Sequence, residues 1–251
     1  EPLPDIDFNI RAGNTLIGYA TETELDKAIV GKIDFDNNKN KIKEKCDLVA
    51  RTFQRYKEIQ LSQGDDYKDF KQAKDELNNR LKNLNEELNQ LLHKLTSGLK
   101  YNEWLSTHQP FHWFAEFYEI IHDKGGFDVI IGNPPYVEYS KVKNNYTIKG
   151  YETESCGNLY AFVIERSFLI SKKSSYISMI VPISLVNMPT YEKSKILITS
   201  YTSYFSNFSG DTHPGTLFQG VQHNLTIFIK TSIQQKLYYT TGFQRFYNNY
   251  R

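Results

Sequence analysis

The chain has 251 residues, enough for one large domain or for one domain with an appendage. Its 30 lysines and arginines nearly balance its 29 aspartates and glutamates, so net charge alone does not indicate nucleic-acid binding, although a basic face can occur on a neutral chain. Cys46 and Cys156 match no metal-ligand spacing and predict reduced thiols in a cytoplasmic protein. No signal peptide is visible and no apolar run approaches the length of a membrane span, so no membrane association is predicted.

The first residues, Glu1-Pro2-Leu3-Pro4, lack an initiator methionine and predict that the chain is an internal fragment of a longer protein. Residues 8–18 predict a short strand followed by a glycine-punctuated turn that contains Gly13-Asn14-Thr15-Leu16. Taken alone, this tetrapeptide indicates an ordinary turn.

Residues 21–100 differ in character, because charged and amide side chains dominate and the apolar positions become periodic. Two series step by four and three residues, as heptad seams do: Ile42, Cys46, Val49, Phe53 and Tyr56, then Leu77, Leu81, Leu84, Leu88, Leu91 and Leu95. A turn at residues 62–66 lets the two seams satisfy each other, so the sequence predicts an antiparallel helical hairpin. A leucine zipper that dimerises the protein is the alternative. The lysines here alternate with acidic residues and predict a solvated face, with phosphate contact as the alternative.

Residues 101–124 are rich in aromatic side chains and predict a core helix that leads into the next strand. The apolar face of this helix comprises Phe111, Phe114, Ala115, Tyr118 and Ile121. Three histidines occur here, namely His108, His112 and His122. No second group of ligands accompanies them, so no metal site is predicted.

Residues 127–136 are the most informative stretch of the chain. An apolar run predicts a buried strand that ends abruptly at Gly132-Asn133-Pro134-Pro135-Tyr136. The prolines cannot donate to a sheet ladder and hold the preceding residues extended, so Asn133 is expected at the carboxyl end of the strand, where open α/β sheets bind ligands. The side-chain oxygen of Asn133 and the backbone carbonyl of Pro134 suit an NH2 group on a planar ring, and Tyr136 offers a flat face beside them. A plain strand-ending turn is the alternative.

The next segment, residues 137–157, is long and polar, and interleaves Lys141, Lys143 and Lys149 with tyrosines. Basic and aromatic side chains in this arrangement suit contacts with nucleic-acid phosphates and strand separation. A flexible loop without that role is an equal alternative.

The remaining sequence predicts further helices and strands. One helix is expected to begin at Asn158 and another to cover residues 190–200, and the segment from there to Gly220 predicts a loop. Strands are predicted at residues 175–182, where a proline stops the strand, and at residues 224–230 and 237–246.

The stretch at residues 127–136 resembles the catalytic signature of the N6-adenine DNA methyltransferases, specifically the large Eco57I-like enzymes of type IIG restriction-modification systems. The resemblance implies methyl transfer from S-adenosylmethionine to N6 of a flipped adenine. That adenine would be stacked on Tyr136, with its amino group held by Asn133 and Pro134. A second aromatic side chain would cover the other face of the base. Phe228 is the candidate for it and Phe218 the reserve, with a core phenylalanine as the alternative.

Other segments add to the resemblance. Gly13-Asn14-Thr15-Leu16 is similar to the family segment Gly-Asn-Ser-Leu, which implies that Asn14 accepts a hydrogen bond from the adenine amino group of S-adenosylmethionine. Asn158-Leu159-Tyr160 is similar to the family segment Asn-Leu-Tyr, which implies that Leu159 lines the cofactor pocket beside Asn133. The segment after Tyr136 implies that Lys141 and Lys143 contact DNA.

The fold class implied by the resemblance is α/β: a Rossmann-like class I S-adenosylmethionine-dependent methyltransferase sheet, incomplete because its first strands are missing, with an inserted antiparallel helical hairpin. Residues 1–20 and 101–251 would form the partial catalytic domain, and residues 21–100 the insertion. No Gly-x-Gly occurs in the chain, so the cofactor-gripping loop of this fold is expected before Glu1 and the isolated fragment is expected to be inactive.

The parent protein is expected to be a site-specific DNA adenine-N6 methyltransferase, with double-stranded DNA as partner and monomeric in solution. Mg²⁺ would be required only if the parent carries a nuclease domain. Two alternatives stay open. One is a methyltransferase that acts on protein glutamine side chains, which shares the tetrapeptide because its target is also a planar amide NH2. The other is a non-catalytic DNA-binding or scaffold segment.

Overall fold

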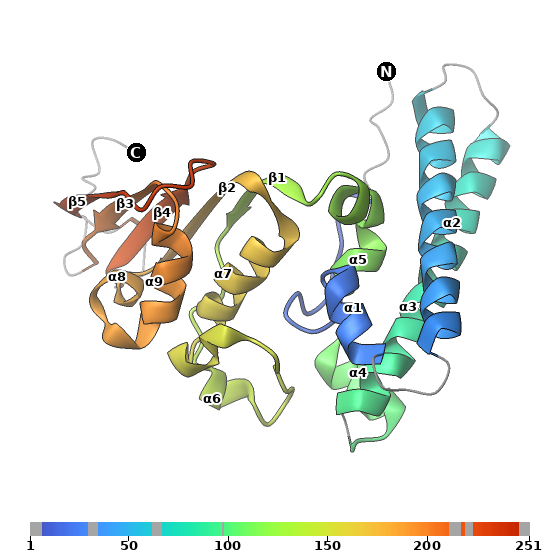
Figure 1. Ribbon diagram of the computed structural model, residues 1–251, viewed down its shortest axis with the longest axis horizontal. Coiled ribbons are helices and arrows are strands. Elements are labelled where there is room, and N and C mark those ends of the chain that lie inside the picture. The colour runs from blue at the N-terminus through green and yellow to red at the C-terminus, as the bar shows by residue number, and fades with distance from the viewer. Residues whose placement is uncertain are drawn as a thin grey trace. The chain divides into compact units, whose positions relative to one another are not determined.

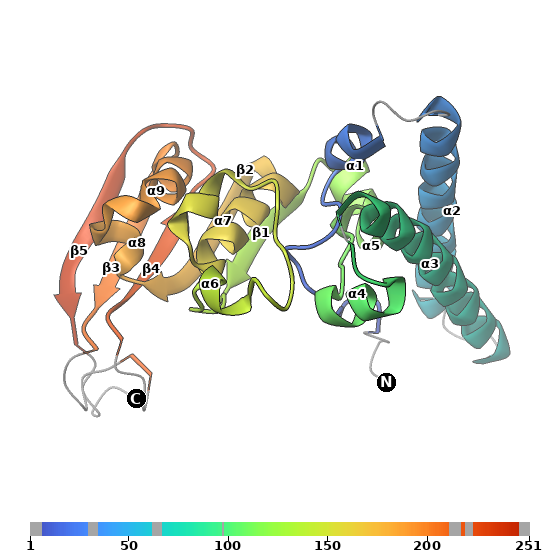
Figure 2. The same cartoon turned by 90° about the horizontal axis from the view of Figure 1, so that it is seen from below.

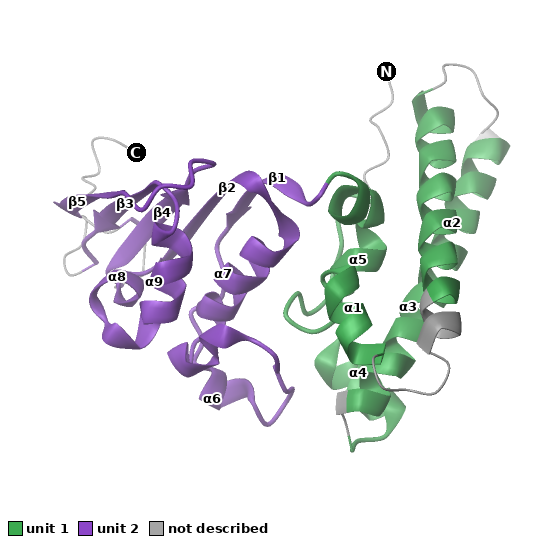
Figure 3. Ribbon diagram, viewed as in Figure 1, with its two compact units in different colours: residues 1–124 green, residues 125–251 purple. Residues whose placement is uncertain are grey.

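The computed structural model describes residues 7–29, 35–61, 67–96, 98–210, 217–218 and 223–245. The chain divides into two compact units, residues 1–124 and residues 125–251 (Figure 3). The described part of the first unit is helical, and the second is built on a sheet. The boundary precedes the strand that carries the Asn-Pro-Pro-Tyr loop, whereas the predicted domains place residues 101–124 with that strand. The predicted domain assignment stays a prediction.

The two long helices of the first unit form an antiparallel hairpin. Helices α2 (Phe35–Leu61) and α3 (Tyr67–Thr96) lie side by side (Figures 1 and 2). Lys45, in the first half of α2, pairs with Glu87 in the last half of α3, and the Tyr56 ring in the last half of α2 lies 5.4 Å from the Phe70 ring near the start of α3. The predicted seams face each other, with these members fully buried: Cys46, Leu77, Leu84 and Leu88. The predicted antiparallel pairing of the two helices is therefore confirmed, and the turn predicted at residues 62–66 lies outside the described residues.

Shorter helical segments flank the hairpin. Helix α1 (Glu22–Ile29) precedes it, and α4 (Tyr101–His108), α5 (Trp113–Glu116) and a π-helical turn (Glu119–Asp123) follow it.

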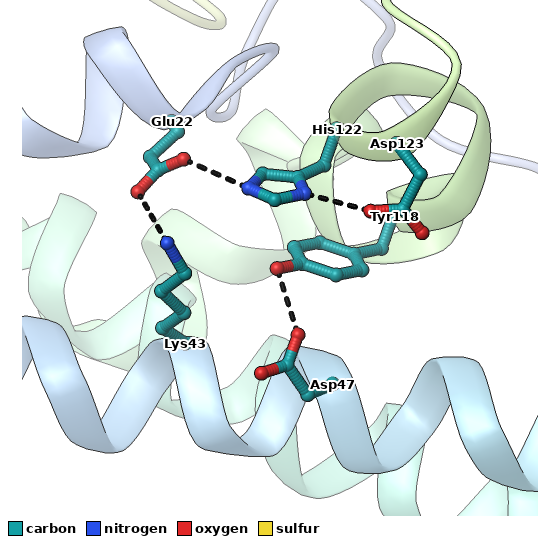
Figure 4. Close-up of polar contacts among 6 residues, drawn as sticks. All are labelled: Glu22, Lys43, Asp47, Tyr118, His122 and Asp123. Carbon is teal, nitrogen blue, oxygen red and sulfur yellow. Dashed lines mark hydrogen bonds and ion pairs between the residues drawn. The ribbon is translucent and has the colours of Figure 1, made fainter.

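A polar cluster ties the hairpin to the segments before and after it (Figure 4). His122 in the π-helical turn lies between two carboxylates, with Nε2 3.3 Å from Glu22 Oε2 of α1 and Nδ1 2.9 Å from Asp123 Oδ1. The His122 ring stacks on Tyr118 at a centroid distance of 4.8 Å, and the Tyr118 hydroxyl donates to Asp47 Oδ1 of α2 over 2.9 Å. Burial raises the pKa of the Tyr118 phenol, so this hydroxyl remains a donor at neutral pH.

The prediction of one continuous core helix at residues 101–124 is wrong, because the segment forms three separate helical pieces. Its apolar face is correct, since Phe111, Phe114, Ala115 and Tyr118 are buried. The helix ends at His108, where Gln109 is left-handed (φ 43°, ψ 56°), and residues 109–112 are not helical. It breaks again at Phe117 (φ −128°, ψ 39°), and the chain then continues as a π-helical turn closed by Lys124 N–H donating to Glu119 O over 3.0 Å.

The strand predicted at residues 8–18 is also wrong, because this segment forms only an isolated bridge between Asn14 and Pro110. Single backbone hydrogen bonds join it to the aromatic segment instead of a ladder: Asn14 N–H donates to Gln109 O and Phe111 N–H donates to Ile17 O, each over 2.7 Å. Gly18 (φ +129°) permits this close approach, since a Cβ there would lie 2.3 Å from the Phe111 carbonyl oxygen.

The second unit contains a five-stranded sheet in the order β1-β2-β4-β3-β5. The strands are β1 Phe127–Gly132, β2 Ser171–Pro182, β3 Ser203–Phe208, β4 Leu225–Lys230 and β5 Tyr238–Gln244. Neighbours β1 and β2 are parallel, as are β3 and β5, whereas β4 is antiparallel to both of its neighbours. This mixed sheet and its helices confirm the predicted α/β fold class.

Helices cover one face of the sheet: α7 (Leu159–Ile170), α8 (Ser184–Asn187) and α9 (Glu192–Thr199) (Figures 1 and 2). The core on this side contains Ile177 and Met179 of β2, Phe205 of β3 and Phe228 of β4, all 5% exposed or less. Apolar burial of this extent is the main stabilising contribution to such a unit.

The prediction that β1 is buried is wrong for this chain. β1 lies at the edge of the described sheet, and its side chains on the face away from α7 are exposed: Val129 is 56% and Ile131 80% exposed. Tyr176, Tyr204 and Ile229, which lie on the same face by the strand register, are 41–47% exposed.

The strand β3 lies in a segment that the sequence predicts to be a loop. Serine and asparagine have weak strand propensity, but here their side chains find partners inside the unit. The Ser203 hydroxyl donates to Ile198 O over 2.7 Å, and Asn207 Nδ2 donates to Thr241 O over 2.8 Å. The other predicted strands, at residues 127–132, 175–182, 224–230 and 237–246, correspond to β1, β2, β4 and β5.

Two alanine substitutions distinguish the face of the sheet that the helices cover from the opposite, exposed face. Phe228→Ala removes a fully buried ring and is expected to lower the free energy of unfolding by about 3–5 kcal/mol. Ile131→Ala is expected to change it by less than about 0.5 kcal/mol, because that side chain is already solvated. Urea unfolding followed by circular dichroism measures both, and equal losses at the two positions would mean that both faces of the sheet are covered in solution.

Candidate functional site

The Asn-Pro-Pro-Tyr loop leaves the sheet at the carboxyl end of β1. Because β1 and β2 are parallel, this is also the end at which Pro182 terminates β2. Asn133 is exposed, whereas the next residue, Pro134, is buried. The loop therefore presents one amide side chain at the edge where α/β sheets of this kind place their ligands.

Tyr136 connects this loop to the sheet. Its hydroxyl oxygen lies 2.9 Å from Asn133 Oδ1 and 3.0 Å from the carbonyl oxygen of Ile180 in β2. The ring is half-buried against the core of the second unit. Burial raises the pKa of the Tyr136 phenol, so the hydroxyl keeps its hydrogen at neutral pH.

A closed loop separates Tyr136 from helix α7. Leu159 N–H donates to Val137 O and Tyr139 N–H donates to Gly157 O, each over 2.9 Å, so the two ends of the loop lie side by side. Within it are the short helix α6 (Tyr139–Val142) and a 3-10 turn (Glu152–Cys156). The closure brings the start of α7 next to the Asn-Pro-Pro-Tyr loop.

The body of this loop is folded, and side chains of α7 hold it. The Glu165 carboxylate accepts hydrogen bonds from the backbone N–H of Glu152 (3.0 Å) and from the N–H and hydroxyl of Thr153 (2.8 and 2.7 Å). Arg166 is buried, and its Nε donates to the Tyr151 hydroxyl over 2.8 Å. These contacts do not support the alternative of a merely flexible loop.

The candidate DNA-contacting lysines lie on the outside of this loop. Lys141 and Lys143 are exposed, and Lys141 Nζ lies 3.8 Å from a carboxylate oxygen of Glu138 one turn earlier. An ion pair this long between two exposed groups is weak and leaves the ammonium available to a phosphate. Their DNA-binding role stays a prediction.

Helix α7 begins as the sequence predicts. Asn158 is its N-cap, and the side chain accepts a hydrogen bond from Tyr160 N–H. Leu159 is buried at the first helical position. The Tyr160 hydroxyl lies 2.9 Å from Ser184 Oγ, just after the end of β2. The role of Leu159 in a cofactor pocket stays a prediction.

The aromatic candidates for the second side of a flipped base differ in exposure. Phe228 is fully buried in the core, with its ring 6.4 Å from that of Phe205, so a base could not reach it in the described conformation. Its position is that of the core phenylalanine considered as the alternative. Phe218 is 40% exposed.

Asn14 belongs to the first unit, whereas the loop, Tyr136 and α7 belong to the second. Its Oδ1 accepts a hydrogen bond from Leu16 N–H over 3.2 Å, which forms a local turn, and one lone pair of that oxygen is left for another donor. The cofactor contact implied for Asn14 stays a prediction.

The histidines of residues 101–124 have structural partners. Buried His112 accepts a hydrogen bond at Nδ1 from Tyr19 N–H, and its Nε2 lies 3.0 Å from Asn89 Oδ1. Across the described residues, no three His, Cys, Asp or Glu side chains are placed to hold a metal ion.

Three contributors to the site escaped sequence reasoning: the Ile180 carbonyl, the Ser184 hydroxyl and the Glu165 carboxylate. A backbone carbonyl carries no sequence signal, and the partners of Ser184 and Glu165 are 12 to 24 residues away along the chain. Only the fold makes them neighbours.

The chain is similar to known proteins across both units. Residues 19–211 match the model of a family described as Eco57I restriction-modification methylase. A protein of Methanocaldococcus jannaschii named "Putative type II restriction enzyme and methyltransferase RM.MjaORFECS2P" is 37% identical over 76 residues, which cover 30% of this chain and 6% of that protein.

Two solved structures show a distant likeness. The DrdV–DNA complex has a TM-score of 0.39 and 14% identity, covering 53% of this chain and 16% of that one. A nuclease-deletion mutant of the Type ISP restriction-modification enzyme LlaGI, in complex with a DNA substrate mimic, has a TM-score of 0.37 and 12% identity, covering 62% of this chain and 17% of that one. The chain thus spans only a small part of the relatives it matches.

No helix among the described residues has the length and apolar character needed to cross a membrane.

Loss of the Glu165 carboxylate is expected to loosen the loop without unfolding α7. In Glu165→Gln, hydrogen exchange at the amides of Glu152 and Thr153 should accelerate by about ten- to a hundredfold, because bonds to a charged acceptor are the stronger class. Hydrogen-exchange mass spectrometry measures this, with Glu154→Gln, an exposed carboxylate of the same turn, as matched control. Unchanged protection in Glu165→Gln would show that other contacts hold the loop.

Proposed function

The chain belongs to the Eco57I restriction-modification methylase family, and from this premise we propose that it carries the amino-group pocket of a DNA methyltransferase acting on N6 of adenine. The observation that supports the proposal is the exposed carboxamide of Asn133 at the carboxyl end of β1, with Oδ1 2.9 Å from the Tyr136 hydroxyl. The proposed substrate is an adenine flipped out of double-stranded DNA and lying against the Tyr136 ring.

The chemistry required of this pocket is orientation. The N6 lone pair of adenine is delocalised into the ring, which makes the nitrogen a poor nucleophile. Hydrogen bonds from the amino group to Asn133 Oδ1 and to the Pro134 carbonyl would draw its hydrogens out of the ring plane and localise the lone pair. No strong base is needed beforehand, because methyl transfer leaves the nitrogen positively charged, and its proton is then acidic enough to be lost to water. Placement and electrostatics then supply most of the rate enhancement.

S-adenosylmethionine, when bound, would supply the methyl group. Two residues of the second unit suit it: the amide oxygen of Asn133 is an acceptor for amino hydrogens, and the apolar Leu159 borders the Asn-Pro-Pro-Tyr loop at the start of α7. In this proposal Asn133 and Leu159 line the cofactor side of the pocket, and the cofactor contact of Asn14 stays a separate prediction for the first unit.

DNA is the proposed partner. Extrusion of a base from the duplex costs a few kcal/mol, and contact with the Tyr136 ring would offset part of that cost. Lys141 and Lys143 on the outside of the folded loop would contact phosphates and make binding salt-dependent. We further propose that the parent is a restriction-modification enzyme that acts as a monomer, with Mg²⁺ needed only for an accompanying nuclease.

A methylation assay with the full-length protein tests the proposal directly. With S-adenosylmethionine and duplex DNA, Asn133→Ala is expected to lower kcat by about a hundredfold or more, the usual size of losing one preorganised polar contact to the reacting group. Transfer of a radiolabelled methyl group to DNA measures it. Asn102→Ala, at an exposed position of α4, serves as control and should leave the rate unchanged.

Full activity of Asn133→Ala would contradict the assigned role of this side chain. Transfer of label to a protein glutamine, with none to DNA, would replace the proposed substrate by the alternative one.

A further inference from the structure

The hydroxyl of Tyr136 faces two acceptors although it carries a single hydrogen. Asn133 Oδ1 is 2.9 Å away and the Ile180 carbonyl oxygen is 3.0 Å away. The first acceptor belongs to an exposed side chain that can turn about its own bonds. The second belongs to the backbone of β2, a strand paired on both sides. The hydroxyl therefore joins a movable carboxamide to a fixed point of the sheet.

We propose that the Tyr136 hydroxyl is a positioning group for the Asn133 carboxamide, a role separate from any contact of the Tyr136 ring with a base. The inference rests on the proposed function. Without substrate, the hydroxyl donates to Asn133 Oδ1 and keeps the oxygen end of the carboxamide beside the ring. Oδ1 has two lone pairs, so it can accept from a target amino group while it still accepts from the hydroxyl, and the carboxamide stays held during methyl transfer.

The orientation of the carboxamide matters because its two ends are chemically opposite. The oxygen accepts hydrogen bonds, whereas the NH2 group donates them and would face a target amino group donor to donor. A solvated asparagine can reverse its amide at little cost. One hydrogen bond of ordinary net strength favours the held orientation by roughly three- to tenfold. That preference is made before substrate arrives, which is what preorganisation requires.

The surroundings support this role. The Tyr136 ring packs against the core of the second unit, so the hydroxyl cannot swing away from the sheet without exposing apolar surface. Burial also raises the pKa of the phenol, which keeps the hydrogen in place at neutral and mildly alkaline pH. Pro134 and Pro135 restrict the backbone between the two side chains, and so preserve the spacing between Asn133 and Tyr136.

Tyr136→Phe is the direct test, because it removes the hydroxyl and retains the ring. In the full-length protein, kcat for DNA methylation is expected to fall about three- to tenfold, while KM for DNA and for S-adenosylmethionine stays within about twofold. The matched control is Tyr176→Phe, which removes a hydroxyl of β2 that accepts a hydrogen bond from the Ser232 hydroxyl at the surface. That variant should retain the wild-type kcat.

A second readout does not depend on activity. In protein labelled with 15N-asparagine, the side-chain NH2 resonances of Asn133, assigned by their absence in Asn133→Ala, should shift toward solvent-exposed values in Tyr136→Phe and not in Tyr176→Phe. A purely structural role of Tyr136 would lower the melting temperature without a selective shift at Asn133.

Unchanged kcat together with unchanged Asn133 resonances in Tyr136→Phe would overturn the inference. An increase in KM for DNA at constant kcat would also overturn it, because the hydroxyl would then contact substrate itself. Absence of DNA methylation by the wild-type protein would instead refute the proposed function, and the resonance measurement would still decide whether the hydroxyl holds the carboxamide.

Discussion

The second unit depends on how the chain is anchored where β1 ends. Two prolines stop the strand, and the Tyr136 hydroxyl then reaches back to Asn133 and across to the Ile180 carbonyl of β2. These contacts hold a four-residue loop against a fixed strand, although its first side chain is exposed. A more mobile loop would spread the carboxamide over many orientations and lose the entropic advantage of a prepared site.

The long loop after Tyr136 extends this anchoring. Its ends are joined by a pair of backbone hydrogen bonds, so the chain returns to the sheet edge at Asn158 and begins α7 there. Glu165 and Arg166 of α7 then hold the body of the loop through hydrogen bonds to Thr153 and Tyr151. Exposed lysines are thereby displayed on a folded support. A folded segment of this kind would place its lysines on a partner at a lower entropic cost than a disordered segment would.

The helical hairpin and the Asn-Pro-Pro-Tyr loop could be predicted because their signals are local. Heptad spacing predicts which side chains meet, and the seams from Ile42 to Tyr56 and from Leu77 to Leu91 are buried or half-buried as that spacing predicts. Leu95, the last predicted member of the second seam, is 42% exposed. Proline geometry likewise predicts that β1 does not continue past Asn133, and the strand ends at Gly132. The Asn158 cap of α7 is another local signal, and it too is confirmed.

The errors occur where tertiary contacts override local preference. Asn207 lies in a strand where a carbonyl distant in sequence, that of Thr241, accepts its amide hydrogen, and Phe117 interrupts a helical segment whose apolar face is otherwise regular. The apolar run of β1 predicts a buried strand. An apolar run shows only that the side chains of a strand can be buried, and here Ile131 is exposed to solvent. For the site, sequence identified the acceptor Asn133 and the aromatic Tyr136. The contact between them, and the Ile180 carbonyl, required the fold.

The most direct test of the account is the identity of the methylated product. The full-length protein would be incubated with S-adenosylmethionine and duplex DNA, and the DNA digested to nucleosides and analysed by mass spectrometry. The account predicts N6-methyladenine as the modified nucleoside. A product methylated on cytosine, or methyl groups found only on protein, would contradict the adenine-amino assignment of the Asn133 pocket.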